Sequence, residues 1–383
     1  MDLRAPLLEL VAPHGLGAEV LPGVVLERAS AELGLRLTFA VAGAGPLHVE
    51  LSPLADTPRY AARSTRLALS YRARGADPGL GKRLCDTLAA AVRDNEERVL
   101  ARLEAEAEAQ AGARLREVEV DTLLEPMGRV TAARDETFYG LSPYVGCLVG
   151  CRFCYAQSHL DPLRRLLGRA AAPWGSWVDA RVNAPAVLAR ELEARPRRPI
   201  KLCPIVSDPY QPLEKRLGLT RACLEVLVGA AFDAPVFVLT RAPLVRRDLP
   251  LLARLPGAHL GVSLPTADDA VRAHFEPRAA SVDERLALLR DARAAGLATF
   301  AVVQPMLAGD RAELADALAA HADSVHLAVL QGEYGAAADF DDPRFAATRE
   351  PAWQKGAAAE LAGLLDARGV PRWEGELPPE RQP

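Results

Sequence analysis

The stretch "GCLVGCRFCYA" (residues 146–156) contains Cys147, Cys151 and Cys154, half of the six cysteines in a chain of 383 residues. Thiolate sulfur is the ligand that iron–sulfur clusters require, and a short loop can present three thiolates to one cluster. Three ligands leave one iron of a 4Fe-4S cluster without a protein partner, so that iron is open to a substrate or cofactor. The spacing therefore predicts a 4Fe-4S cluster with one open iron, held by these three cysteines.

Two other interpretations of the cysteines stay open at this point. A structural zinc site needs four nitrogen or sulfur ligands, usually in local pairs. His159 follows Cys154 by five residues, and no second Cys/His pair at metal-ligand spacing occurs elsewhere. Disulfide bonds form mainly in oxidising compartments, whereas the rest of the sequence has the features of a cytoplasmic protein. Both interpretations are therefore less well supported than a cluster.

The composition indicates a protein with a full-size core and no membrane partner. Half of the residues are hydrophobic, yet no apolar run approaches 18 residues. The N-terminus "MDLRAPLLEL" lacks a basic region followed by an apolar stretch, so we expect a cytoplasmic location. The net charge of -4, from 46 basic and 50 acidic residues, gives no support for binding to nucleic-acid phosphates.

A regular alternation of short apolar runs and longer amphipathic stretches extends from about residue 130 to 335. It predicts helices over 184–194, 219–231, 245–254, 281–295 and 311–321. The expected strands are 140–146, 199–207, 235–240, 258–264, 298–305 and 324–330. This order predicts right-handed βαβ units with a parallel sheet. Six repeats suggest an α/β fold built as an open barrel rather than a complete eight-stranded one, and a doubly wound open sheet is the alternative.

The N-terminal part of the chain has a different pattern. The alternating runs "LRLTFAVAG", "LHVELSPL" and "TRLALSYRA" predict an antiparallel sheet, and residues 80–110 predict a long helix. No metal-ligand cluster, glycine-rich phosphate loop or basic patch is evident there. We therefore expect an N-terminal α+β accessory domain (1–125), the barrel (126–335), and a C-terminal helix near 353–368 with a tail (336–383).

The motifs around the cysteines resemble a known family. The Cys-x3-Cys-x2-Cys spacing, with Phe153 and Tyr155 beside the third cysteine, is similar to the signature of the radical S-adenosylmethionine (SAM) superfamily. The flanking "LSPYVGCLVGCRFCYA" and the later segments resemble its spore photoproduct lyase-like branch over about residues 140–335. The later segments, in order, are "SDPYQPLEKRLGLTR", "VLTRAPLVRRDLPLL", "GVSLPT", "FEPRAAS", "ERLALLRDARAAGL" and "QPMLAG".

The resemblance implies a fold and a chemistry. The fold is a partial TIM-type barrel that carries the cluster in the loop after its first strand, with the reactive centre at the carboxyl ends of the strands. The cofactors are a 4Fe-4S cluster and SAM, which is cleaved reductively to a 5'-deoxyadenosyl radical that abstracts hydrogen from a substrate. The implied partners are a reductant such as flavodoxin or ferredoxin and a substrate that could be DNA, a peptide or a small molecule.

The resemblance also implies roles for single residues. Arg241 stands where the family usually has lysine, and it would contact the SAM carboxylate with altered geometry. For the positions outside the cysteine loop, the alternative is that the side chain satisfies the local backbone. The implied roles are cluster ligands for Cys147, Cys151 and Cys154, adenine contact for Tyr155, binding of the methionine end of SAM at the end of the second strand for Ser207 and Asp208, and ribose or carboxylate contact for Ser263.

One departure from the family limits the assignment of a substrate. The DNA repair lyase of this branch has a hydrogen-donating cysteine at the end of the second strand, where this chain has Val206 and Ser207. Cys203 is the nearest thiol, and strand alternation would place it on the same face as Ser207. It is a candidate hydrogen donor, or a simply packed cysteine. DNA lesion repair, a non-enzymatic iron–sulfur protein and a zinc-binding protein are the alternative functions.

Overall fold

The computed structural model describes residues 8–30, 35–52, 69–75, 77–108, 115–127, 130–131, 134–135, 137–157, 160, 172–203, 205–330 and 332–379. The chain divides into two compact units. One consists of Met1–Arg114 with Ala156–Ala172, and the other of Leu115–Tyr155 with Pro173–Pro383. No helix within the described ranges has the length and apolar character needed to cross a lipid bilayer.

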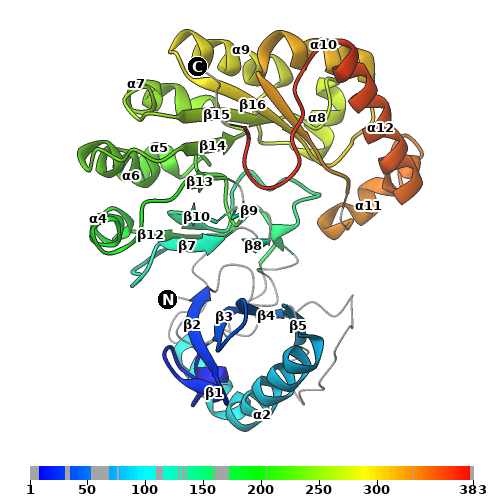
Figure 1. Cartoon of the computed structure of the whole chain (residues 1–383). Helices are drawn as coiled ribbons and strands as arrows, with labels where there is room; N and C mark the ends of the chain where they lie inside the picture. Colours follow the sequence, from blue (N-terminus) through cyan, green and yellow to red (C-terminus); the bar gives the residue numbers. More distant parts are fainter. Residues whose placement is uncertain are drawn as a thin grey trace. The chain divides into compact units, whose positions relative to one another are not determined.

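The first unit contains an antiparallel sheet covered by one long helix (Figure 1). Alternate strand residues such as Leu37, Phe39 and Val49 pack against Leu84 and Leu88 of the helix in one buried core. The predicted helix is thus observed, and residues 65–68 of the third predicted strand lie outside the described residues. The elements are β1 (Glu19–Leu21), β2 (Val24–Ser30), β3 (Leu35–Val41), β4 (Leu47–Ser52), β5 (Ser70–Arg74) and α2 (Pro78–Glu108).

The face of this sheet that points away from α2 gathers charged side chains that are scattered in the sequence. Arg36 lies opposite Glu50, with 3.9 Å between the charged groups, and Arg74 lies opposite His48. Burial lowers the pKa of His48, and the positive charges of Arg28 and Arg74 lower it further. Strand alternation thus brings two distant arginines near one histidine on this face, and the expected absence of a basic patch stays a prediction.

The second unit is built on a seven-stranded mixed sheet. Six strands run parallel and follow one another in chain order, and β7 is antiparallel at the edge. A doubly wound sheet reverses its strand order, so this alternative is excluded. The order across the sheet is β17 (Ser324–Leu327), β16 (Ala298–Val303), β15 (Ala258–Ser263), β14 (Val236–Thr240), β13 (Ile200–Leu202), β10 (Phe138–Leu141) and β7 (Leu124–Met127).

Smaller sheets accompany the main one. The strands β11 (Tyr144–Val145), β12 (Val178–Arg181) and β6 (Leu115–Val118) form a three-stranded sheet. A short hairpin consists of β8 (Val130–Thr131) and β9 (Arg134–Asp135). The predicted strand 140–146 is therefore two strands in two different sheets, because the chain turns between Leu141 and Tyr144.

The main helices follow one another along one side of the main sheet (Figure 1). Their apolar side chains share one core with alternate strand residues such as Ile200, Val236 and Leu260. Polar caps define their starts, as at α9, where Ser281 and Glu284 form a capping box. The helices of this core are α4 (Ala184–Ala194), α6 (Leu219–Gly229), α7 (Leu249–Leu252), α9 (Val282–Ala294), α10 (Arg311–His321) and α12 (Pro351–Ala367). The short helices α5 (Glu214–Leu217), α8 (Asp269–Phe275) and α11 (Ala337–Phe340) pack in other apolar clusters.

Two predicted elements have different ends in the structure. The strand predicted over 199–207 ends at Leu202, so residues 203–207 lie beyond it. Residue 204 is a proline, which has no N–H to extend a strand ladder. The helix predicted over 245–254 begins as a 3-10 turn, Pro243–Asp248, and continues as α7.

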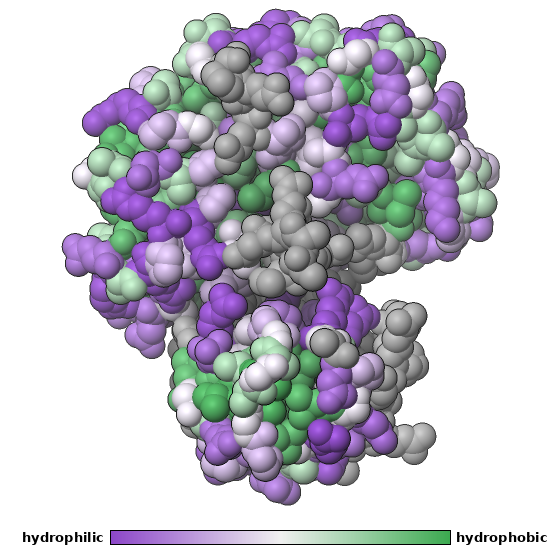
Figure 2. All heavy atoms as spheres, viewed as in Figure 1, coloured by the Kyte–Doolittle hydropathy of each residue, from purple (hydrophilic) through white to green (hydrophobic). Residues whose placement is uncertain are grey.

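The C-terminal segment lies against the opposite face of the main sheet. The Trp373 ring contacts Phe300 and His326, with ring centroids 5.9 and 5.3 Å apart. Lys201 donates a hydrogen bond to the carbonyl oxygen of Glu376 at 2.6 Å. Both faces of the sheet are therefore covered, and on the side viewed in Figure 2 hydrophilic side chains are spread over the outer helices.

Candidate cluster and cofactor site

Two glycines determine the path of the cysteine loop, which follows β11. Gly146 and Gly150 have φ angles of +82° and +63°, a region that other residues rarely adopt. A Cβ atom at Gly146 would lie 2.4 Å from the ring of Trp177, and one at Gly150 would lie 2.2 Å from the guanidinium of Arg278. The glycines of "GCLVGC" therefore permit a tight loop that is closely packed on its surroundings.

The three cysteines of the loop pack into one apolar cluster and form no disulfide, with Cys147 and Cys151 buried and Cys154 partly exposed. Burial and the Asp208 carboxylate raise the pKa of Cys147, while backbone N–H groups of Asp208, Val149 and Gly150 oppose the rise. Burial also raises the pKa of Cys151, although the positive charge of Arg241 acts against it. Both thiols therefore have a raised pKa, and amide hydrogens are already directed at the sulfur of Cys147.

These surroundings suit a cluster. Amide hydrogens directed at sulfur stabilise a bound thiolate, and Cys147 and Cys154 lie near enough to Cys151 to influence its pKa. In the described part of the chain, no three His, Cys, Asp or Glu side chains are arranged to hold one metal ion. A cluster makes a different demand, because each thiolate binds its own iron. The residues present therefore fit a 4Fe-4S cluster bound by Cys147, Cys151 and Cys154.

Aromatic side chains cover the cysteine loop. Phe275 at the end of α8 lies 6.3 Å from Phe153 between ring centroids, 5.2 Å from Phe340 and 5.0 Å from Phe345. The backbone N–H of Arg152 donates to the carbonyl of Phe275 at 2.9 Å. Residues far apart in the sequence thus enclose the loop in apolar surroundings.

Asp208 joins the carboxyl ends of two neighbouring strands. Its Oδ1 accepts hydrogen bonds from the Thr240 hydroxyl at 2.6 Å and from the backbone N–H of Tyr210 at 2.9 Å. Its Oδ2 accepts from the backbone N–H of Arg241 at 2.9 Å. The carboxylate therefore holds the end of β14 against the turn that follows β13, and the prediction that Ser207 and Asp208 end a strand is wrong.

Gln211 connects Ser207 with the cysteine loop. Its side-chain amide donates to the Ser207 hydroxyl at 3.1 Å and to the Gly146 carbonyl at 3.5 Å, and its Oε1 accepts from the backbone N–H of Leu148 at 3.0 Å. Gln211 is completely buried. Ser207 is therefore placed next to the loop by a residue that also satisfies two backbone groups of the loop.

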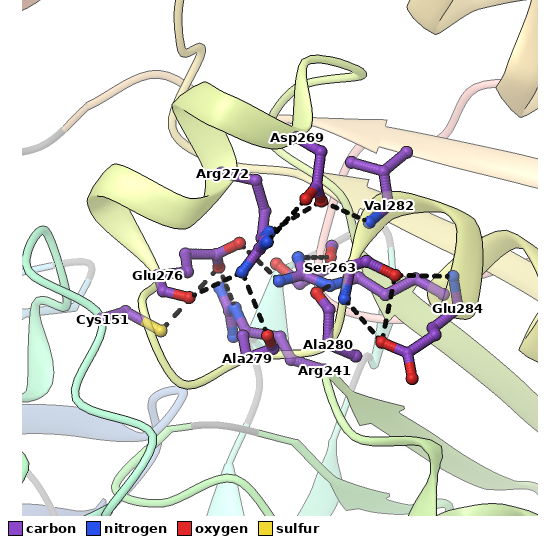
Figure 3. Close-up of polar contacts among 12 residues, drawn as sticks. Cys151, Arg241, Ser263, Asp269, Arg272, Glu276, Ala279, Ala280, Val282 and Glu284 are labelled. Carbon is purple, nitrogen blue, oxygen red and sulfur yellow. Dashed lines mark hydrogen bonds and ion pairs between the residues drawn. The ribbon is translucent and has the colours of Figure 1, made fainter.

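Arg241, Glu276 and Arg285 form a buried charged group beside Cys151 (Figure 3). Arg241 Nε donates to Glu276 Oε1 at 2.5 Å, and Arg285 Nη2 lies 2.7 Å from Glu276 Oε2. Cys151 Sγ lies 3.8 Å from the same Oε1 atom. Burial, the largest influence, raises the pKa of Glu276, but Arg285 and Arg241 together outweigh it and lower the pKa overall. Arg285 also binds the Ser263 carbonyl at 2.7 Å, which links β15 to this group.

The structure thus connects most of the predicted positions through contacts. The cysteine loop, Ser207, Asp208 and Arg241 are linked as described, and Ser263 is linked through its backbone. Cys203 is buried one residue beyond β13, so strand alternation no longer relates it to Ser207. Tyr155 follows the third cysteine and is partly exposed. The roles of these residues toward SAM stay predictions.

Three residues of the site were not predicted from the sequence, namely Gln211, Glu276 and Arg285. Each lies inside a segment that carried the family resemblance, but polar residues on helices and turns are common, and none had a distinctive spacing. Glu276 lies 125 positions from Cys151. Such contacts depend on the folded chain and give no local signal.

Related proteins share about half of this chain. An uncharacterized protein of Mycobacterium tuberculosis (strain H37Rv) is 34% identical over 176 residues, which are 44% of this chain and 49% of that protein. An uncharacterized protein of Methanocaldococcus jannaschii is 26% identical over 169 residues, covering 44% of this chain and 60% of that protein. This chain therefore spans about half the length of its mycobacterial relative.

Two solved structures show weaker similarity. A spore photoproduct lyase variant with bound AdoMet and dinucleoside spore photoproduct has a TM-score of 0.42 and 19% identity, covering 60% of this chain and 72% of that one. Streptococcus suis SuiB bound to its precursor peptide SuiA has a TM-score of 0.35 and 12% identity, covering 64% of this chain and 45% of that one.

A family model matches part of this chain. The model of the radical SAM superfamily matches residues 141–321. That range contains the cysteine loop, the carboxyl ends of β13 to β15 and the charged group around Glu276. Residues 141–321 are therefore similar to the radical SAM superfamily, whose members are enzymes that use a 4Fe-4S cluster and S-adenosylmethionine.

Proposed function

We propose that the protein is a radical SAM enzyme that cleaves SAM reductively and abstracts hydrogen from a substrate. The observation that carries this proposal is the direct connection between the cysteine loop and the strand ends. Cys151, the central thiol of the loop, shares Glu276 with Arg241 at the end of β14. The cysteine loop is thus linked through a carboxylate to a buried arginine at the strand ends. This arrangement is expected for a site that binds an anionic cofactor beside a cluster.

Different residues of the chain would bind the cluster and SAM. Cys147, Cys151 and Cys154 hold the cluster, and Arg241 binds the SAM carboxylate. Ser207, after β13, and Ser263, at the end of β15, contact the cofactor. Asp208 holds the turn after β13 against the end of β14, which lies between them. When bound, the cluster and SAM supply the electron transfer that yields methionine and a 5'-deoxyadenosyl radical.

The aromatic cover would protect this chemistry. Radical reactions need exclusion of water and of stray hydrogen donors. Phe153, Phe275, Phe340 and Phe345 enclose the loop with apolar surface. Their role is to keep the reactive centre dry.

We further propose that the six parallel strands and their helices form a partial (β/α)6 barrel. Sequential strand order with helices along one side supports it. Residues 126–335 would be the catalytic core and residues 1–125 an accessory region. A flavodoxin or ferredoxin would deliver the electron. The substrate class is left unassigned between DNA, peptide and small molecule, with Cys203 as a candidate hydrogen donor.

The test is SAM cleavage by the anaerobically reconstituted full chain. With reductant and SAM it should slowly form methionine and 5'-deoxyadenosine. Cys151→Ala should abolish the reaction, and Ser207→Ala and Arg241→Ala should slow it, because small misplacements of a bound reactant cost much rate. Intact SAM with a fully loaded cluster would indicate a non-enzymatic iron–sulfur protein. Stoichiometric zinc with no capacity for iron would indicate a zinc protein.

A further inference from the structure

We propose that Glu276 is a positioning residue that aims the Arg241 guanidinium at the carboxylate of SAM. This inference rests on the proposed function and names a residue that acts on SAM through another. Glu276 lies in the turn after α8, and its carboxylate is completely buried.

The first step is the way Glu276 shares its two oxygens. Oε1 accepts from Arg241 Nε at 2.5 Å, and Oε2 lies 2.7 Å from Arg285 Nη2. A buried carboxylate is stable only when its charge is paired and hydrogen-bonded. Two arginines share the carboxylate of Glu276, and the Asp208 carboxylate also acts on the charge of Arg241. Because Glu276 divides its charge between two cations, Arg241 keeps donors for a further anion.

The second step is that each guanidinium nitrogen of Arg285 has a hydrogen bond or an ion-pair contact, whereas Arg241 has one at Nε alone among the described residues. Arg285 donates from Nε to the Ala280 carbonyl at 3.0 Å and from Nη1 to the Ser263 carbonyl at 2.7 Å, in addition to its contact with Glu276. Of the three guanidinium nitrogens of Arg241, only Nε has a hydrogen-bond partner among the described residues. Arg285 therefore anchors Glu276, while the terminal nitrogens of Arg241 are available to a ligand.

The third step is the planar shape of guanidinium. An arginine offers donors on two edges of one rigid fork, and each edge can hold a carboxylate. Glu276 takes the Nε side of Arg241, which fixes the plane of the fork and leaves the edge formed by the two terminal nitrogens for a second anion. Lysine has no second edge and would not need such a partner. Glu276 is thus the residue that gives Arg241 one orientation.

The fourth step is that Glu276 itself is held rigidly next to the cluster loop. Its backbone N–H donates to the Arg272 carbonyl at 2.7 Å, and its carbonyl accepts from Arg272 Nη1 at 3.3 Å. Arg272 is in turn paired with Asp269 (Figure 3). Because Cys151 Sγ lies 3.8 Å from Oε1, the position of Arg241 is set relative to the cysteine loop.

The experiment measures affinity for SAM and for decarboxylated SAM, which lacks only the carboxylate. Binding is measured on the full-length holoenzyme with its cluster oxidised, so that no turnover occurs, and iron content is measured beside it. Glu276→Gln keeps the size of the side chain and removes its charge. This variant should lower the affinity for SAM by at least about tenfold, because the misaligned Arg241 no longer forms a charge-assisted pair with the SAM carboxylate. The affinity for decarboxylated SAM should stay nearly unchanged.

Two further variants make the test specific. Arg241→Lys removes the two-edged fork. The double variant with Glu276→Gln should therefore bind SAM no more weakly than Arg241→Lys alone. Glu191→Gln is the matched control, since Glu191 is also a buried carboxylate paired with an arginine, Arg195, outside the site. It should leave the ratio of the two affinities as in the natural chain. If Glu276→Gln does not take up iron, Glu276→Asp, which keeps the charge but draws it away from Arg241, should show the same loss.

The outcomes separate the two proposals. The natural chain should bind SAM more tightly than decarboxylated SAM. If the variants at Glu276 show the same ratio of the two affinities, the positioning role alone is overturned. A further loss from Glu276→Gln in the Arg241→Lys chain also overturns it, since Glu276 would then act without Arg241. A natural chain that holds iron but does not distinguish SAM from decarboxylated SAM contradicts both the role of Arg241 and this inference.

Discussion

Glycine determines the shape of the cysteine loop at the residue scale. Gly150 has a φ of +63°, and its Cα faces Gly175 so closely that a Cβ atom would lie 3.0 Å from that backbone atom. Arg278 fills the adjacent space and donates from Nε to the Val149 carbonyl at 3.3 Å. The loop therefore depends on the absence of a side chain at this position.

Replacing Gly150 with alanine should lower iron uptake. The left-handed conformation costs a non-glycine residue about 1–2 kcal/mol, and the new methyl group would also displace Arg278. Gly218→Ala is the control, because Gly218 has a φ of +64° and an added methyl group there would meet no atom within 4 Å. Iron content and thermal unfolding of both variants are compared. Equal iron uptake by the two would show that crowding at Gly150 is irrelevant to the cluster.

The grouping of the three cysteines in one loop could be predicted from the sequence, whereas the buried residues that contact this loop could not. Cysteine spacing is a local pattern, and thiolates in a short loop suit few metal groups. The contacts of Gln211 and Glu276 join segments that are distant in the chain, so only the folded structure reveals them. Asp208 lies in the turn after β13 and not at a strand end, because the apolar run that predicts the strand continues past Leu202, where β13 ends.

At the scale of elements, apolar periodicity predicted most of the second unit. Buried parallel strands need continuous apolar runs, and the helices between them show one apolar stripe. The predicted helices 184–194 and 311–321 match α4 and α10 at both ends. The strands β7 and β12 were missed, because "LEPM" and "VDAR" are short and include charged residues or proline.

The aromatic cover contributed by α8 and α11 leads to a prediction at this scale. Phe340→Ala should shorten the lifetime of the cluster in air, because removing the ring opens a path for oxygen and water to the loop. Phe232→Ala is the matched control, since both rings are buried and Phe232 belongs to the core beneath the helices. Each substitution should cost about 3–5 kcal/mol of stability. Decay of the cluster absorbance at equal rates in both variants would argue against a protective cover.

At the scale of the whole molecule, the chain holds two separately packed units. Among the residues that the structure describes, the core around α2 shares none with the core beneath the helices of the second unit. Chains with several units depart from two-state unfolding. We therefore expect the units to unfold in distinct steps.

Calorimetry of two core variants tests this expectation. Leu88→Ala lies in the core of the first unit and Leu260→Ala in the core of the second, and both side chains are fully buried. Each should lose about 2–5 kcal/mol and shift a different transition to lower temperature. One cooperative transition that moves in both variants would mean that the chain unfolds as a single unit.

The Mössbauer spectrum of the full chain, reconstituted with 57Fe and recorded with and without SAM, tests the central claim most directly. Three cysteine ligands should give about four irons per chain, of which one has no protein ligand. Addition of SAM should change the signal of that one iron and leave the other three as they were. A spectrum that SAM does not alter, or a chain that fails to assemble a four-iron cluster, would contradict the account.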